Sequence, residues 1–253
     1  MKFEGIVLNV DEIDITGRLY LPDDDRSVYS TVCICHGIPS GNPVNPDDGG
    51  YPLLAEQICS RGYAVFIFNF RGAGTSGGNL DMYGWTRDLN AVIDYLYQRP
   101  EIDNSFVSLL GFSAGAAVSV YTAAHDMRVT SVVACSCPAE FGFLDPESAL
   151  ERFRNIGTIR DRDFPDSISK WAEGFKTVRP INYIHDISPR HVAIIHGEDD
   201  EVVNISHAYR LYDKAGEPKR LRTIPGAGHK LRNNAQALEK VFECLSFLDS
   251  RIE

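Results

Sequence analysis

The sequence lacks any apolar run long enough to cross a membrane. Its longest apolar stretches, such as Ala64-Val65-Phe66-Ile67-Phe68, are far shorter than the roughly 20 residues that a transmembrane helix needs. The first residues also lack the basic and apolar regions of a signal peptide, and acidic residues follow soon at Asp11, Glu12 and Asp14. We therefore expect a cytoplasmic protein with no membrane partner.

Positive charge is also scarce. The chain has 25 Lys and Arg residues against 35 Asp and Glu residues, which gives a formal net charge of −10. A field of that sign repels phosphate backbones and anionic lipid surfaces. We expect no nucleic-acid partner, and the charge favours neutral substrates, or ones with a cationic part, over polyanions.

Cysteines are few, and their setting does not favour a metal site. Two C-x-C pairs lie in apolar, strand-like runs, whereas zinc sites usually use C-x₂₋₄-C in loops. Free cysteine behaves as a small buried hydrophobe, and disulfides are rare in cytosolic proteins. We predict six buried free thiols and no metal: Cys33, Cys35, Cys59, Cys135, Cys137 and Cys244.

Strand-like and helix-like segments alternate along the 253 residues. This alternation predicts βαβ units, a mainly parallel sheet, and ligand binding beyond the carboxyl ends of the strands. An opening hairpin is predicted at 5–10 and 13–20. Further strands are predicted at 31–35, 64–68, 106–110, 131–135, 192–195 and 220–224. Helices are predicted at 51–61, 86–98, 114–124 and 235–248.

One segment interrupts this rhythm. Residues 138–189 separate two predicted strands and are far longer than an ordinary connection. We predict a small, mostly helical cap insertion at 138–189, with the α/β core formed by 1–137 and 190–253. Its aromatic residues could line a substrate pocket or form the interior of the insertion, and the second interpretation is favoured. They are Phe141, Phe143, Phe164, Trp171 and Phe175.

The strongest chemical motif is Gly111-Phe112-Ser113-Ala114-Gly115. It lies between a predicted strand and a predicted helix, which is the setting of a nucleophile elbow. Such a turn exposes the serine Oγ, and the flanking glycines avoid collisions with neighbouring elements. The helix N-terminus favours developing negative charge at the same place. Ser113 is the predicted nucleophile, and the alternative is a glycine-rich turn whose serine only caps the helix.

A serine hydroxyl needs a base. His229 follows the last predicted strand, in Pro225-Gly226-Ala227-Gly228-His229. Its place near the end of the chain agrees with the chain order Ser…Asp…His that accompanies a nucleophile elbow. We predict His229 as the base, with His36 and His196, both at strand ends, as rivals.

The base needs an acidic partner to fix its tautomer and stabilise its cation. The run Glu198-Asp199-Asp200-Glu201 follows a predicted strand and Gly197. Asp200, the third residue after Gly197, is the predicted acid, and Asp199 is the next candidate.

An oxyanion hole needs two backbone N–H donors. One is expected from Ala114, directly after the nucleophile. The other is expected from the loop that begins His36-Gly37-Ile38-Pro39, where Pro39 has no N–H and Ile38 is therefore the predicted donor.

These motifs together resemble the α/β-hydrolase superfamily over nearly the whole chain. His36-Gly37-Ile38-Pro39 resembles the oxyanion motif. The run from Phe68 to Gly78 resembles the loop after the fourth strand in bacterial esterase-like and dienelactone-hydrolase-like members. The chain departs from dienelactone hydrolases proper, which carry cysteine at the position of Ser113, and from haloalkane dehalogenases, which carry aspartate. The resemblance implies an eight-stranded, mostly parallel sheet flanked by helices, with a small cap.

The predicted function is hydrolysis of a carboxylic ester through an acyl-enzyme on Ser113, with a small-molecule acyl substrate and no cofactor. Thioesters and amides stay open as substrates, because the same triad serves all three. The resemblance also allows a lyase, for which Arg152, Arg154 or Lys170 could supply a cation, or a binding protein on an inactive scaffold. A homodimer is left open.

Overall fold

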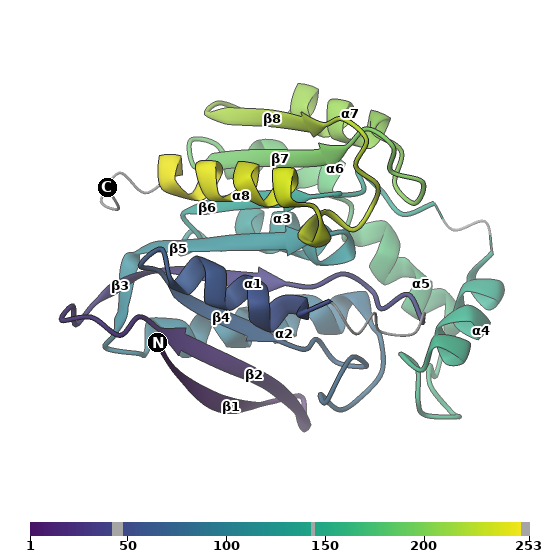
Figure 1. Cartoon of the computed structure of the whole chain (residues 1–253). Helices are drawn as coiled ribbons and strands as arrows, with labels where there is room; N and C mark the ends of the chain where they lie inside the picture. Colours follow the sequence, from purple (N-terminus) through teal and green to yellow (C-terminus); the bar gives the residue numbers. More distant parts are fainter. Residues whose placement is uncertain (42–47, 143–144, 249–253) are drawn as a thin grey trace.

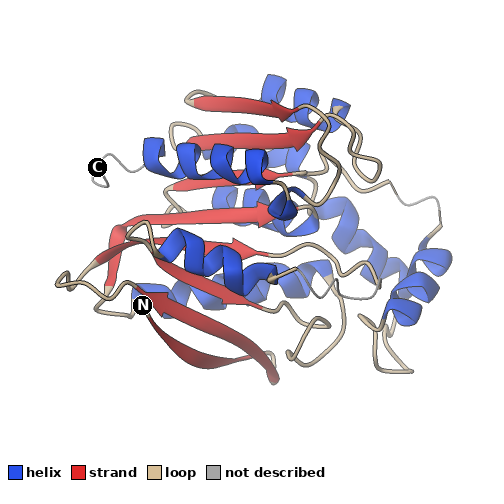
Figure 2. Cartoon of the chain, viewed as in Figure 1, coloured by secondary structure: helices blue, strands red, loops and turns tan. Residues whose placement is uncertain are grey.

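An eight-stranded sheet forms the centre of the molecule, with helices on both of its faces (Figures 1 and 2). The computed structural model describes residues 1–41, 48–142 and 145–248. The strands are β1 (Lys2–Val10), β2 (Ile13–Leu21), β3 (Tyr29–Cys35), β4 (Ala64–Phe68), β5 (Ile102–Phe112), β6 (Ser131–Cys135), β7 (His191–Gly197) and β8 (Lys219–Ile224).

The strand order is β1-β2-β4-β3-β5-β6-β7-β8. β1 pairs antiparallel with β2, and β2 pairs antiparallel with β4. Every other neighbouring pair is parallel. The carboxyl ends of β3 to β8 therefore meet at one edge of the sheet, and the loops that follow these strands are brought together there.

Helices cover the two faces unequally. The helices α1 and α8 lie on one face, in front of the sheet in Figure 1. Their residues Leu54, Ile58 and Val241 belong to one buried core cluster. On the opposite face Trp85 and Leu211 belong to a second, larger cluster. The helices are α1 (Gly50–Cys59), α2 (Met82–Tyr97), α3 (Ala114–His125), α4 (Pro146–Ile156), α5 (Ile168–Thr177), α6 (Pro180–Tyr183), α7 (Ser206–Lys214) and α8 (Ala235–Leu248), with 3-10 turns η1 (Ile184–Ile187) and η2 (Leu231–Asn233).

The strands alternate their side chains between these two clusters, as the pleat requires. Val32 and Ile34 of β3 face the cluster of α1 and α8, whereas Cys33 and Cys35 face the other cluster. β3 is buried along its whole length, which explains why its sequence reads as one continuous apolar run.

The predicted fold class is confirmed, and every predicted strand and helix is present. The main differences are at element ends. β5 begins at Ile102 rather than 106, and α2 begins at Met82 rather than 86, where Asp81 caps the helix by accepting hydrogen bonds from two backbone N–H groups. α7 was not predicted from the sequence.

The segment between β6 and β7 folds into α4, α5, α6 and η1. Phe153, Trp171 and Phe175 are buried, and their ring centroids lie 5.1 to 6.1 Å apart. All three belong to the larger core cluster, and the Trp171 indole N–H donates to the Leu80 carbonyl at 2.9 Å. These aromatics therefore form the interior beneath the insertion. Phe143 lies outside the described residues, and the domain boundaries at 138 and 189 stay predictions.

All six cysteines are free and buried, as predicted. Within the described residues, no group of three or more His, Cys, Asp and Glu side chains is arranged to hold a metal ion. No helix in the described part of the chain is long and apolar enough to cross a membrane.

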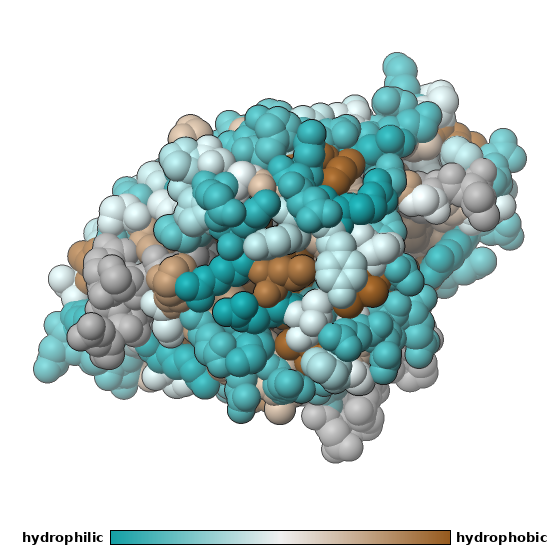
Figure 3. Space-filling model, turned by 90° about the horizontal axis from the view of Figure 1, so that it is seen from above, coloured by the Kyte–Doolittle hydropathy of each residue, from teal (hydrophilic) through white to brown (hydrophobic). Residues whose placement is uncertain are grey.

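The surface seen from above, towards the β8 edge, is mainly hydrophilic (Figure 3). Hydrophobic atoms appear there only in small separate areas among the residues that the structure describes. Scattered apolar residues of this kind are normal on a globular surface.

Candidate active site

The turn between β5 and α3 holds Ser113 in a strained backbone conformation. Its φ is 53° and its ψ is −122°, a region that non-glycine residues rarely adopt. Strain of this kind, at a sharp strand-to-helix turn, is typical of a nucleophile elbow. The Ser113 N–H donates to the Cys135 carbonyl at 2.9 Å, so β6 helps to hold the turn in place.

The two glycines of the motif are required by close backbone contacts. A Cβ on Gly115 would lie 2.3 Å from the carbonyl oxygens of Cys35 and His36. A Cβ on Gly111 would lie 2.4 Å from the Cα of Ala116. These glycines let α3 start directly against the carboxyl end of β3, which brings the loop after β3 next to Ser113.

His229 and Asp200 form a hydrogen-bonded pair at the same edge of the sheet. The His229 Nδ1 lies 2.8 Å from Asp200 Oδ2 and 3.0 Å from Oδ1. Since the carboxylate accepts, Nδ1 carries the proton and Nε2 is left with its lone pair. Asp200 is buried and the His229 side chain is 21% exposed, so the imidazole lies between the interior and the open side.

The surroundings of Asp200 keep its carboxylate ionised. Burial alone would raise the pKa of Asp200, but hydrogen bonds with His196 and His229 outweigh it and hold this pKa well below its usual range. The backbone N–H groups of Val202 and Val203 also donate to Oδ1, at 2.9 and 2.8 Å. A fixed negative charge beside Nδ1 stabilises the imidazolium that forms when Nε2 takes a proton.

Ser113 and His229 line the same cavity. Within the described residues, no hydrogen bond joins the Ser113 hydroxyl to His229. Such contacts are often long in unliganded sites and shorten when substrate binds. The loop of His229 is held from β6, because the Ser136 hydroxyl donates to the His229 carbonyl at 3.1 Å.

The two predicted oxyanion donors lie on either side of the serine. A Cβ on Gly37 would be 3.0 Å from the Ser113 Cβ, so the loop that carries Ile38 runs directly beside the nucleophile. Ala114 begins α3. Neither the Ile38 nor the Ala114 N–H donates to a backbone or side-chain acceptor in the described part of the chain. The continuation of this loop at 42–46 lies outside the described residues.

The rival histidines have structural roles. The Phe70 N–H donates to His36 Nε2 at 3.0 Å, and His36 Nδ1 lies 2.7 Å from the Gly37 carbonyl, to which it donates. Burial lowers the pKa of His36, in keeping with this neutral tautomer. His196 is fully buried, and its Nε2 donates to the Val203 carbonyl at 2.8 Å. This hydrogen bond helps to fix the loop that carries Asp200.

The cavity has a volume of about 870 Å³. It extends from Ser113 across the ends of β3 and β4 to Arg18 on β2, and the first turn of α1 forms another side. Among the described residues of the insertion, none lines this cavity. The buried aromatic residues of the insertion belong instead to the larger core cluster.

Sequence reasoning missed one cluster at this site. Arg232 pairs with both carboxylate oxygens of Asp48, and its guanidinium carbon lies 5.2 Å from the centre of the Tyr51 ring. Burial raises the pKa of Tyr51 to about 12, although the charge of Arg232 opposes the shift. Asp48 and Arg232 are 184 positions apart, and neither belongs to a recognisable motif. The pair ties the start of α1 to the loop of His229.

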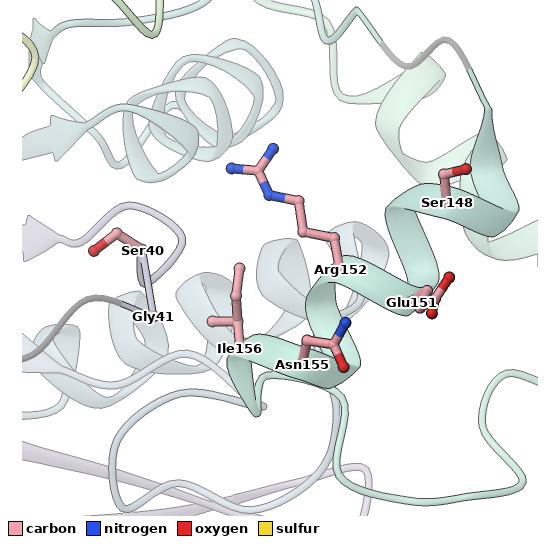
Figure 4. Close-up of a pocket in the computed structure, with 7 residues that line it drawn as sticks. All are labelled: Ser40, Gly41, Ser148, Glu151, Arg152, Asn155 and Ile156. Carbon is pink, nitrogen blue, oxygen red and sulfur yellow. The ribbon is translucent and has the colours of Figure 1, made fainter.

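A second cavity, of about 420 Å³, lies between α4 and the loop after β3 (Figure 4). Ser40 and Gly41 line both cavities, so the two adjoin. Arg152 projects from α4 into this space. Of the three cationic candidates in the insertion, Arg152 lines this second cavity. Arg154 instead donates to two carbonyls within the insertion.

The fold and the arrangement of the sheet define the chain as an α/β hydrolase. More narrowly, the chain belongs to the BD-FAE family, whose profile matches residues 18–215.

Solved structures of other proteins share this fold. The α/β hydrolase GrgF from Penicillium sp. sh18 aligns with a TM-score of 0.79 and 17% identity, covering 100% of this chain and 99% of that one. Est1E from Butyrivibrio proteoclasticus, solved with ferulic acid bound, aligns with a TM-score of 0.73 and 19% identity over 96% of each chain.

Similarity in sequence is moderate. The uncharacterized protein YfhR of Escherichia coli K12 is 28% identical over 181 residues, which cover 71% of this chain and 57% of YfhR. The uncharacterized protein YqkD of Bacillus subtilis is 28% identical over 228 residues, which cover 86% of this chain and 70% of YqkD. The match thus spans a little over half the length of YfhR.

Proposed function

We propose that the protein is a serine hydrolase that cleaves carboxylic esters, with Ser113 as nucleophile, His229 as base and Asp200 as the acid that orients the base. The observation that carries this proposal is the hydrogen-bonded His229–Asp200 pair beside a strained Ser113, all at the carboxyl edge of the sheet. Membership of the BD-FAE family supports the reaction class.

In the first half of the reaction, His229 Nε2 removes the proton from the Ser113 hydroxyl, and Oγ attacks the ester carbonyl. The backbone N–H groups of Ile38 and Ala114 donate to the resulting oxyanion. His229 then protonates the alcohol oxygen as the C–O bond breaks, which leaves the acyl group on Ser113. In the second half, His229 activates a water molecule that releases the acid and restores the serine.

Active-site labelling tests the nucleophile directly. A fluorophosphonate reagent should label the wild-type protein but not Ser113→Ala, and Ser206→Ala, which changes an exposed serine on α7, should label like wild type. Labelling that persists in Ser113→Ala would show that the nucleophile is another residue. No labelling of the wild type would favour a binding protein on this scaffold.

The bond cleaved is tested with matched substrates. A series of 4-nitrophenyl esters of rising chain length, the corresponding thioesters and aminoacyl amides would be compared by kcat/KM. We expect the esters to be cleaved faster than the amides, because the alkoxide or phenolate is a better leaving group than an amine, and at least as fast as the thioesters. Faster turnover of thioesters or amides would replace the ester assignment while leaving the triad intact.

A further inference from the structure

The charges that line the catalytic cavity are opposite in sign to the charge of the whole chain. The chain carries a net −10. Among the described residues, the cavity beside Ser113 is lined by three cationic side chains, Arg18, Lys230 and Arg232, and by one carboxylate, that of Asp48. Because clefts focus the field of the charges around them, this lining attracts anions in spite of the overall charge.

Two of these cations have no ion-pair partner in the described part of the chain. Arg232 is neutralised by Asp48. Arg18 and Lys230 are exposed, and the charged group of neither side chain forms a hydrogen bond or ion pair with any residue that the structure describes. Arginines elsewhere are mostly satisfied: Arg71 is paired with Asp88, and Arg128 with Asp126.

Arg18 is also held in place. Its guanidinium carbon lies 5.6 Å from the centre of the Phe3 ring, a contact that restrains the side chain and leaves its N–H groups available. A planar guanidinium with free N–H groups matches a carboxylate, which it can bind through two parallel hydrogen bonds.

The sheet register gives the separation between Arg18 and the nucleophile. Arg18 lies opposite Ile67, Ile67 opposite Ile34, and Ile34 opposite Leu110. Three strand spacings amount to about 14 Å, and the three residues from Leu110 to Ser113 add about 10 Å along the chain direction. The Cα atoms of Arg18 and Ser113 are thus on the order of 17 Å apart. The side chains of both residues extend into this distance, so a ligand has a shorter gap to span.

Apolar side chains line part of the cavity, among them Tyr51, Pro52, Ile67, Phe68 and Phe112. Ile67 lies on β4, which stands in the sheet between β2, the strand of Arg18, and β5, the strand that leads to Ser113. An extended hydrocarbon chain could pack against these apolar side chains. A negative charge at the far end of that chain would meet Arg18.

We propose that the cavity binds esters that carry a carboxylate remote from the scissile bond, with Arg18 as the partner of that carboxylate. This inference rests on the proposed esterase function, and it names the substrate class. Lys230 adds positive charge at the end of the cavity next to His229.

The test compares two esters that differ only at the far end. Mono-4-nitrophenyl suberate ends in a carboxylate where 4-nitrophenyl octanoate ends in a methyl group. Arg18→Gln should lower kcat/KM for the suberate ester about tenfold, as the loss of a charge-assisted hydrogen bond predicts, and leave the octanoate ester within about twofold. Added salt should weaken turnover of the suberate ester alone in the wild type.

Arg220→Gln is the matched control. Arg220 lies on β8, its guanidinium carbon is 3.1 Å from the Phe247 ring centre, and it does not line the cavity. This variant should treat both esters as wild type does. Equal effects of Arg18→Gln on the two esters, or no effect, overturn the proposal. Loss of the preference in Lys230→Gln instead would overturn the assignment to Arg18.

Binding of free suberate separates this inference from the proposed function. Calorimetry with the wild type should show weak binding that Arg18→Gln reduces and Arg220→Gln preserves, whether or not either ester is hydrolysed. Equal affinity in the two variants, or no binding to the wild type, overturns the carboxylate site. Absence of hydrolysis and of fluorophosphonate labelling overturns the esterase function alone.

Discussion

At the scale of single residues, the candidate acid is the sharpest test of the site. Asp200 accepts from His229 and from two backbone N–H groups, whereas Asp199 is exposed. Asp200→Asn should reduce kcat by several orders of magnitude, roughly 10⁴-fold by analogy with such a change in a known triad. Asp199→Asn should keep kcat close to the wild-type value. Stopped assays on one activated ester would decide the point, and the reverse result would move the acid by one residue.

A second prediction concerns the glycine after the nucleophile. Gly115→Ala places a methyl group 2.3 Å from the carbonyl oxygens of Cys35, the last residue of β3, and of His36, which follows it. We expect a loss of at least about 2 kcal/mol in unfolding free energy, since backbone cannot give way as a side chain can, and a large fall in activity. Gly5→Ala is the control, because a Cβ there meets nothing within 4 Å. Urea denaturation gives the unfolding free energy of both variants. A Gly115→Ala protein as stable as the wild type would contradict the packing argument.

Sequence reasoning predicted Ser113, Asp200 and His229 because each follows a strand beside a glycine motif, and such a motif can be recognised from the sequence alone. The walls of the cavity have no such signal. Arg18 and Arg232 come from β2 and η2, and only the sheet order brings them to one site. The net charge suggested neutral or cationic ligands, but a sum over the chain does not give the sign of the charge inside one cavity.

At the scale of elements, α2 is anchored by a buried ion pair. Arg71, in the loop after β4, makes a 2.7 Å contact with Asp88 on α2, and the exposed fraction of the two side chains is 5% and 0%. The Arg71 backbone N–H also donates to Asp88 Oδ2 at 2.9 Å. Removal of the carboxylate therefore leaves the Arg71 backbone N–H without its acceptor. It also leaves the buried guanidinium with Asp11, whose side chain is 42% exposed, as its remaining ion-pair partner among the described residues.

Asp88→Ala should accordingly lower the unfolding free energy by about 3–5 kcal/mol. Asp94→Ala provides the control on the same helix, because Asp94 is 58% exposed where it meets Arg128 and such pairs contribute about 1 kcal/mol or less. Chemical denaturation at neutral pH compares the two. Equal losses would mean that the buried pair does not anchor α2.

The elements also show where periodicity fails. α2 buries nine residues and has a clear apolar stripe. In α7 only Ala208 and Leu211 are buried, which is too few for a helical pattern to emerge from the sequence. The insertion was recognised by its length, but its position depended on contacts such as Trp171 to Leu80, between residues 91 positions apart. Contacts between residues so far apart in the sequence produce no pattern in the sequence near either residue.

At the scale of the whole molecule, His36 links stability to pH. The fold holds this imidazole neutral, with its pKa below the ordinary value of about 6.5 because of burial. As pH falls below about 6.5, the unfolded chain takes up a proton that the folded chain does not, so stability decreases towards acid, by up to about 1.4 kcal/mol per pH unit for one such histidine. Stability from this group is complete above that pH.

The measurement is the unfolding free energy from pH 7.5 to 5.5. His36→Gln should reduce the slope of unfolding free energy against pH by up to about 1.4 kcal/mol per pH unit, the contribution of one proton. His191 and His207 also have lowered pKa values, so part of the slope should remain. An unaltered slope in His36→Gln would contradict the neutral tautomer assigned from its two hydrogen bonds.

The six buried cysteines can be used to measure how often the native structure opens. Burial raises the pKa of Cys59 to about 11 and that of Cys137 further, so the reactive thiolate is scarce as well as hidden. A thiol reagent can therefore modify the chain only when the sheet and its covering helices separate. The rate of colour development with such a reagent in native buffer would time this separation without denaturant. A single cysteine introduced on the surface, for example Met127→Cys, would react at once and accept a label while the native thiols stay silent.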